Sequence, residues 1–300
     1  MSTHGTGKIL TKEQRDQLEA DLTFPRIVEL ELNPVQGQFD AVHLKEINRR
    51  IFQDLPGAGL TDVTPGQYRP ASPAGKDWYK NRGLSVANKQ TFFVAYSSMD
   101  ASAQTRLDTA LQSADPAKLG KLKTKGFTDA IAKLYVELDY LHPFSDGNSR
   151  TLRTFTRQLA REAGYNIEWE RFNKGEGGRD VLYIARDLSV NALAEPHLQD
   201  DNTRLAIKTS MLMLDGNRTL PELLTDAVRP LRAIAFEQLP ERDALQDHPE
   251  LVDAYEMLHA VAANLKQALV TDPGAQDQAI RSAKQKMVER LNEGQTHNFV

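Results

Sequence analysis

The stretch HPFSDGNSRTLR, from His142 to Arg153, places a histidine, an acid, a Gly-Asn pair and two arginines between two segments with helical periodicity. The apolar stripe before the loop consists of Phe127, Ile131, Leu134, Leu138 and Leu141. The stripe after it consists of Leu152, Phe155 and Leu159. Spacings of three and four bury one face of a helix. The sequence therefore predicts a helix that Pro143 ends and a second helix that begins near Gly147 and is capped by Gly164.

Two side chains in this loop suit acid–base and metal chemistry. An unperturbed imidazole has a pKa near 6.5, so His142 can accept a proton at neutral pH. The carboxylate of Asp146 is a hard oxygen ligand that suits Mg²⁺. Either group alone is ordinarily structural, since a histidine before proline and an Asp-Gly-Asn turn are common. Their combination with the next features favours a functional interpretation over a structural one.

The remaining groups suit a phosphate. Unpaired backbone N–H groups at the start of the second helix, near Gly147 and Asn148, form an anion site with the helix dipole. Arg150 and Arg153 are three residues apart on one helix face and can donate to phosphate oxygens. Together with a base and a magnesium ligand, these groups indicate transfer of a phosphorus-containing group from a nucleotide to a hydroxyl.

The motif resembles the signature of the Fic family, HPFx[D/E]GNGRxxR, at every fixed position except Ser149, where the family has glycine. The stretch GQFDAVHLKEINRRIFQDL, at 37–55, is similar to an early helix of Fic domains. LSVANKQTFF, which begins at Leu84, lies where the family has a hairpin called the flap. The resemblance covers about residues 27–200. It implies an all-α fold with a Fic-type helical core and a short β-hairpin flap. The chain adds a C-terminal helical extension, residues 201–300, which has no counterpart in this resemblance.

The resemblance also implies an activity, the transfer of AMP from ATP to a Ser, Thr or Tyr hydroxyl of a target protein with release of pyrophosphate. His142 would be the base, and Asp146 would hold Mg²⁺ between the α- and β-phosphates. The anion hole for the α-phosphate would include Gly147 and Asn148, with Ser149 on the same turn. The β- and γ-phosphates would be gripped by Arg150 and Arg153. The flap would pair with the target's backbone, with Lys89 at its tip.

Ser149 leaves two alternatives to adenylyl transfer open. Its side chain either tolerates or crowds the α-phosphate, and relatives with larger changes in this turn transfer other groups. The first alternative is therefore a phosphotransferase that moves the γ-phosphate. The second is a weakly catalytic protein-binding module, against which the presence of both arginines, the base and the acid argues.

Many Fic proteins carry an inhibitory helix with the pattern [ST]xxxE[GN], whose glutamate pairs with the second motif arginine. The two Glu-Gly pairs of this chain do not fit, because Phe172 and Glu289 occupy the positions that require Ser or Thr. We therefore expect either unrestrained activity or restraint by a separate antitoxin-like protein. A role as a bacterial toxin or effector follows from the resemblance alone.

Composition limits the partners and the location. The 300 residues carry 37 basic and 41 acidic side chains, for a net charge of -4, so nothing favours binding to nucleic acid or an anionic membrane. The chain has no cysteine and therefore no thiolate metal site or thiol nucleophile. The first residues lack the apolar core of a secretory signal peptide, so we expect none, and no apolar run is long enough to span a bilayer. We expect a cytoplasmic protein, or one secreted into a host cell by a signal not recognisable here.

Three regions are expected along the chain. Residues 1–26 are polar and predict a mobile leader. Residues 27–200 would form the Fic domain, in which Asp40 caps an early helix, 56–83 is a Pro- and Gly-rich loop and 84–96 is the hairpin. Residues 201–300 would form a helical C-terminal extension of unknown role.

Overall fold

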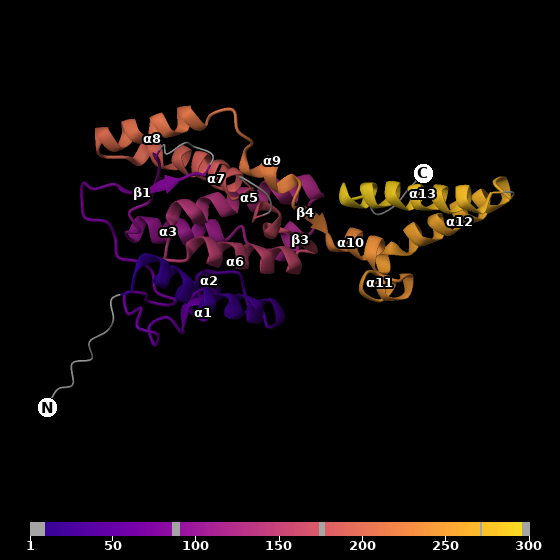
Figure 1. Cartoon of the computed structure of the whole chain (residues 1–300), viewed down its shortest axis with the longest axis horizontal. Coiled ribbons are helices and arrows are strands. Elements are labelled where there is room, and N and C mark those ends of the chain that lie inside the picture. Colours follow the sequence, from indigo (N-terminus) through magenta and orange to yellow (C-terminus); the bar gives the residue numbers. More distant parts are fainter. Residues whose placement is uncertain (1–9, 86–90, 174–177, 271, 296–300) are drawn as a thin grey trace. The chain divides into compact units, whose positions relative to one another are not determined.

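The computed structural model describes residues 10–85, 91–173, 178–270 and 272–295 (Figure 1). It consists mainly of helices with two small antiparallel sheets, which confirms the predicted all-α class with a short hairpin. The chain divides into two compact units. Unit 1 holds the described residues of 1–115, 131–159 and 169–223, and unit 2 holds those of 116–130, 160–168 and 224–300. No helix among the described residues is long and apolar enough to cross a membrane.

The helices on either side of the motif are those that the periodicity predicts. α5 runs over Thr124–Leu141 and α6 over Asn148–Glu162. The apolar stripes of both helices are buried. Gly164 follows α6 with φ +83°, a left-handed conformation that glycine adopts without steric cost. The motif loop therefore lies between two well-packed helices.

The N-terminal segment differs from the prediction. α1 spans Lys12–Leu32, so the expected leader is wrong for residues 12–26. A capping box between Thr11 and Gln14 starts the helix. Glu19, Thr23 and Leu30 on one face of α1 are buried. α1 packs against α2 (Ala41–Phe52), whose cap is Asp40 as predicted. The polar composition of α1 hid this helix because tertiary contacts stabilise it.

The hairpin begins earlier than predicted. β1 is Trp78–Gly83, inside the segment that the sequence indicated as loop, and it pairs with β2, Thr91–Tyr96. Only the second strand lies in the predicted segment of 84–96. The first was missed because its half-buried positions carry Trp78, Lys80 and Arg82, which give no apolar alternation.

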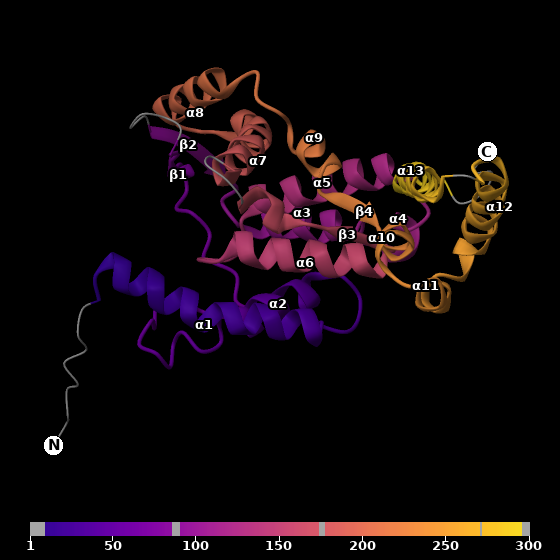
Figure 2. The same ribbon diagram turned by 45° about the vertical axis from the view of Figure 1, so that its right-hand side comes forward.

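Two helices of unit 1 cover the outer edge of β2 (Figure 2). They are α7 (Gly178–Ala194) and α8 (Asp201–Leu214). Ser210 on α8 accepts a hydrogen bond from the backbone N–H of Phe93 at 3.0 Å. Asn191 on α7 bonds to the backbone of Phe93 and Ala95 at 2.9 and 3.0 Å. With the β2 edge satisfied, β1 provides the available edge of the described hairpin.

The remaining elements of unit 1 are α3 (Ala101–Leu111) and the short turns Trp169–Asn173 and Glu195–His197. The boundary between the two units, after residue 223, falls within α9 (Leu220–Thr225). The domain boundary expected after residue 200 stays a prediction. In the structure, unit 1 includes α8 and continues to residue 223.

Unit 2 has its own apolar core. Ala233, Phe236, Tyr255, Met287 and Leu291 are buried in it, from α10 (Leu231–Gln238), α12 (Val252–Ala268) and α13 (Pro273–Asn292). The other elements of this unit are α4 (Pro116–Leu119), β3 (Tyr165–Ile167), β4 (Val228–Pro230), α11 (Glu241–Asp247) and the turn Pro249–Leu251.

Candidate active site

A buried arginine holds the backbone where the motif begins. His142 ends α5 with φ +44°, a left-handed conformation that is uncommon for a residue with a Cβ. The Nε of Arg69 donates to the carbonyl of His142 at 2.8 Å, and its Nη2 donates to that of Leu141 at 3.3 Å. Burial lowers the pKa of Arg69 to about 10, so it stays charged at neutral pH. This cation satisfies the last carbonyls of the helix and compensates for the strained turn.

Asn148 locks the loop with its side chain. Its Oδ1 accepts from the backbone N–H of Phe144 at 2.9 Å, and its Nδ2 donates to the carbonyl of Phe144 at 2.7 Å. Both residues are buried. The side-chain amide of Asn148 is thus occupied within the loop, so at this turn an anion would be bound by backbone N–H groups of α6 and not by this side chain.

Gly147 is required by both conformation and space. Its φ is +69°, and a Cβ there would lie 1.8 Å from Cζ of Phe52. Phe52 is buried on α2, so its packed ring would have to shift. Ser149 differs, because it does not have positive φ. The backbone therefore does not demand the glycine that the motif has at this position.

The imidazole of His142 is enclosed by aromatic rings and polar groups. The ring centroids of His142 and Tyr96 are 4.0 Å apart, and those of His142 and Trp78 are 5.2 Å apart. Nε2 lies 3.2 Å from Nζ of Lys80, and Nδ1 lies 3.6 Å from Oδ1 of Asp139. Burial lowers the pKa of His142 to about 4, and Asp139 opposes this shift only in part. The imidazole is therefore a neutral proton acceptor at pH 7.

The two motif arginines have different surroundings. Arg150 donates to Glu19 and, at 3.1 Å, to Thr23, both on α1, and its guanidinium lies 4.8 Å from the ring centre of Phe52. The Nε of Arg153 donates to the carbonyl of Ser149 at 3.2 Å. No carboxylate of the described residues lies within ion-pair distance of Arg153. Arg150 is thus anchored by an acid, whereas Arg153 keeps its charge available.

One cavity of about 460 Å³ joins these groups. Its lining includes the predicted residues His142, Asp146, Gly147, Asn148, Ser149, Arg150 and Arg153. Lys80, Arg82, Arg179, Leu182, Tyr183, Arg186 and Tyr96 complete it. Six cationic side chains and one carboxylate line it. Three of the cations, Arg82, Arg150 and Arg186, pair with acids outside the lining. The other three still leave the cavity positive, which suits a polyphosphate. Lys89, predicted at the flap tip, lies outside the described residues.

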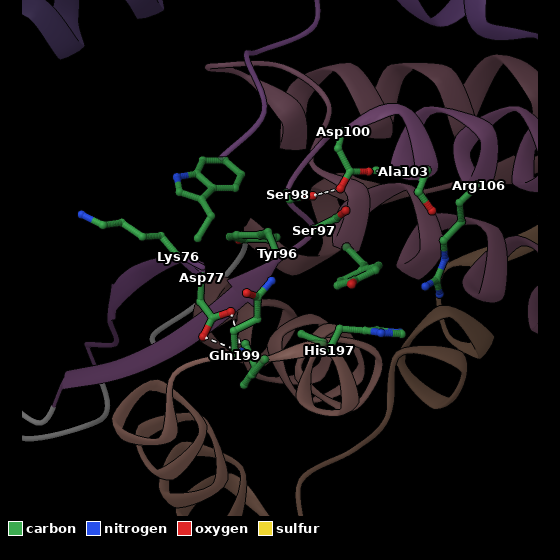
Figure 3. A pocket seen from close by; sticks show the side chains of 15 residues that line it. Lys76, Asp77, Tyr96, Ser97, Ser98, Asp100, Ala103, Arg106, His197 and Gln199 are labelled. Carbon is green, nitrogen blue, oxygen red and sulfur yellow. Dashed lines mark hydrogen bonds between the residues drawn. The ribbon is translucent and has the colours of Figure 1, made fainter. Parts of the chain in front are cut away.

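A second cavity, of about 290 Å³, lies in the same unit and shares Tyr96 with the first (Figure 3). Its two carboxylates already accept hydrogen bonds within the fold. Asp100 accepts from Ser98 at 2.7 Å, and Asp77 accepts from the backbone N–H of Gln199 at 3.0 and 3.1 Å. None of the predicted site residues lines it. It is therefore not the candidate active site.

Asp146 determines how a metal ion would fit. Its Oδ1 accepts from the backbone N–H of Gly147 at 2.6 Å. The described residues contain no group of three or more His, Asp or Glu side chains that could cage an ion. A single carboxylate fits Mg²⁺ that takes its other ligands from phosphates and water. The donor set thus suits a magnesium–nucleotide complex.

Sequence reasoning missed four residues that surround the base. Arg69 supports the backbone, Lys80 faces Nε2, Asp139 faces Nδ1 and Arg186 binds Asp139. Only Asp139 left a signal in the sequence. It lies three residues before His142, about one helical turn, so the sequence places an acid within reach of the imidazole. The others come from a distant loop, strand and helix.

Comparison with known proteins finds similarity to the Fic/DOC family, whose model matches residues 38–160. The protein adenylyltransferase VbhT of Bartonella schoenbuchensis is 30% identical over 187 residues, which are 62% of this chain and 34% of VbhT. The probable protein adenylyltransferase Fic of Escherichia coli is 25% identical over 168 residues, which are 55% of this chain and 71% of that protein.

The chain thus spans about a third of VbhT. Among solved structures, the N-terminal Fic domain of a VirB-translocated Bep effector from Bartonella quintana aligns with a TM-score of 0.49 and 19% identity, over 79% of this chain and 94% of that one. The same kind of domain with bound ADP aligns with a TM-score of 0.47 and 20% identity, over 75% and 89%.

Proposed function

We propose that this protein is a protein adenylyltransferase, which transfers AMP from ATP to a Ser, Thr or Tyr hydroxyl of a target protein and releases pyrophosphate. One observation carries the proposal. A buried His142, whose pKa burial lowers, lines the same cavity as the first turn of α6 and the motif arginines. The names of the related adenylyltransferases support the same activity.

The residues divide the chemistry between them. Nε2 of His142 takes the proton of the target hydroxyl, whose oxygen then bonds to the α-phosphorus while the bond to the β-phosphate oxygen breaks. Backbone N–H groups at the start of α6 stabilise charge on the α-phosphate. Arg150 and Arg153 donate to the leaving pyrophosphate. Mg²⁺ held by Asp146 and the phosphates would neutralise the developing negative charge.

The target's backbone would pair with β1. Side chains alternate along a strand, so Lys80 and Arg82 point to the cavity while Tyr79, Asn81 and Gly83 are exposed. Because α7 and α8 cover the edge of β2, β1 offers its edge for an added strand. Strand addition there would bring the target close to the base, which Lys80 of the same strand contacts.

Restraint of the activity would come from a separate protein. The described residues place no carboxylate on Arg153, so this arginine can receive either a phosphate or an acid from a partner. The Bartonella relatives described as translocated effectors support a role as a bacterial toxin or effector. Such a role is consistent with unrestrained activity of the isolated chain.

The test uses ATP labelled either on the α- or on the γ-phosphate. Wild type and His142→Ala would each be incubated with a bacterial lysate and Mg²⁺. Adenylyl transfer predicts protein-bound label only from the α-labelled ATP and only with wild type. Label from the γ-position would instead support a phosphotransferase, and nucleotide binding without any label would support a binding module.

A further inference from the structure

Two buried polar atoms face each other beside the base without another partner. Nδ1 of His142 and Oδ1 of Asp139 are both buried, and neither has a hydrogen-bond partner within normal distance. They lie 3.6 Å apart, one helical turn apart on α5. Leaving two such groups unpaired is costly, and a shift of a few tenths of an ångström would join them. The geometry thus favours a hydrogen bond from Nδ1–H to Oδ1.

The other oxygen of Asp139 is held by an arginine from α7. Nε and Nη2 of Arg186 donate to Oδ2 at 3.0 and 2.7 Å. The side chains of Arg186 and Asp139 are 2% and 1% exposed. Burial alone would raise the pKa of Asp139, but Arg186 and His142 outweigh it and hold that pKa below its usual value. The carboxylate is therefore charged, fixed in orientation and left with one oxygen for the imidazole.

The same guanidinium reaches the start of α6. Nη1 of Arg186 lies 3.5 Å from Oγ of Ser149, the residue that departs from the family motif. Ser149 lies on the turn whose backbone N–H groups line the anion site. A hydroxyl held by Arg186 is directed to α7. The departure from glycine thus has a local partner, which lies beyond the residues that match the family model.

We propose that Asp139 and Arg186 are positioning residues. Arg186 orients Asp139, and Oδ1 of Asp139 then holds the imidazole of His142 so that Nε2 is the proton acceptor. Arg186 also restrains the hydroxyl of Ser149. The kinetic expectations of this proposal rest on the proposed adenylyl transfer. The expected positions of the imidazole proton and of the Ser149 hydroxyl do not rest on that function, because both concern this chain's own residues without a bound nucleotide.

The other groups around His142 are compatible with this assignment. Lys80 on β1 faces Nε2 and, as a donor, favours the same tautomer. The ring of Tyr96 on β2 packs on the imidazole, and burial raises the pKa of this phenol, so it stays neutral. Arg69 binds the backbone carbonyl of His142 and adds positive charge nearby. Among these groups, Asp139 is the one with an acceptor oxygen recorded near Nδ1, at 3.6 Å.

The first test is ¹⁵N NMR of the full chain labelled at histidine, without nucleotide. We expect wild-type His142 in the Nδ1–H tautomer by at least about tenfold. Asp139→Asn should reduce that ratio about tenfold, whereas Glu137→Gln should not. Glu137 is the matched control, because it lies on α5 and pairs with Arg106 through two hydrogen bonds. A wild-type Nε2–H tautomer, or an unchanged ratio in Asp139→Asn, would overturn the proposal.

The second test concerns Arg186 and Ser149. Arg186→Lys keeps the positive charge but loses the planar guanidinium, which contacts Asp139 and Ser149 at once. The hydroxyl of Ser149 would then be free to enter the anion site, so the Kd for Mg-ATP, measured by calorimetry, should rise about tenfold. Adding Ser149→Gly to Arg186→Lys should recover at least about threefold, since no hydroxyl would remain to enter the anion site. No recovery would refute the restraint of Ser149. Thermal unfolding of each variant controls for loss of folding.

Kinetics then separate positioning from general damage. If the chain transfers AMP, Asp139→Asn should lower kcat by about 10–100-fold with little change in KM for ATP. An equal loss in kcat for Glu137→Gln would contradict a specific role. If wild type transfers no AMP, the proposed function fails while the NMR result still decides the positioning of His142.

Discussion

Gly147→Ala tests the steric account of the motif loop. The substitution would place a methyl group 1.8 Å from Cζ of Phe52 at a residue with φ +69°. Forcing alanine into the left-handed region costs about 1–2 kcal/mol. Overpacking against a buried ring adds about 1–3 kcal/mol. We therefore expect the free energy of unfolding to fall by about 2–5 kcal/mol.

Gly75→Ala provides the matched control. Its φ is +73°, nearly that of Gly147, and nothing lies within 4 Å of the place that its methyl group would occupy. Both glycines belong to unit 1. This control should lose only the left-handed cost, about 1–2 kcal/mol. The difference between the two variants isolates the contact with Phe52.

Urea unfolding followed by circular dichroism measures both free energies. The double variant Gly147→Ala with Phe52→Leu should be less destabilised than the sum of its single variants, by about 1–3 kcal/mol, because the smaller side chain makes room. Equal losses in Gly147→Ala and Gly75→Ala would refute the reasoning. Strict additivity in the double variant would show that Phe52 is not the obstacle.

Three further predictions concern charge. Burial lowers the pKa of His142 to about 4, so between pH 6.5 and 4 the unfolded chain binds more protons than the folded chain. The free energy of unfolding should therefore fall as the pH drops through this window, by up to about 1.4 kcal/mol per pH unit. Urea unfolding of wild type and His142→Gln at several pH values checks this, and equal pH slopes for the two proteins would contradict it. Glu19→Gln should lower the free energy of unfolding by about 1–2 kcal/mol because it removes the partly buried partner of Arg150, whereas Glu46→Gln, which removes an exposed pair, should cost less than about 1 kcal/mol in the same assay. Asp146→Asn should abolish the gain in ATP affinity that Mg²⁺ gives in calorimetry and leave affinity in EDTA within about twofold; an undiminished magnesium effect would exclude this carboxylate as the ligand.

The sequence was most informative where chemistry and periodicity are local. The stripes of α5 and α6 and the cap at Asp40 depend on spacing within one helix, and the structure confirms them. The residues from His142 to Arg153 are contiguous, so their convergence on one cavity follows from the loop and a single helix turn.

The missed features depend on contacts between distant segments. The first turns of α1 are polar, and its Glu19 is buried because Arg150, more than a hundred residues later, pairs with it. β1 was missed because its inward side chains are long and polar and face the cavity. Arg186 could not be assigned, since an arginine on a helix is ordinarily solvated and only the fold brings it to Asp139.

The most direct test of the account is intact-protein mass spectrometry of a modified target. The protein most strongly labelled in the lysate would be purified after incubation with Mg-ATP and with either wild type or His142→Ala. The account predicts a gain of one AMP, mapped by fragmentation to a Ser, Thr or Tyr side chain and lost with His142→Ala. A gain of one phosphate, or an AMP adduct that persists with His142→Ala, would contradict it.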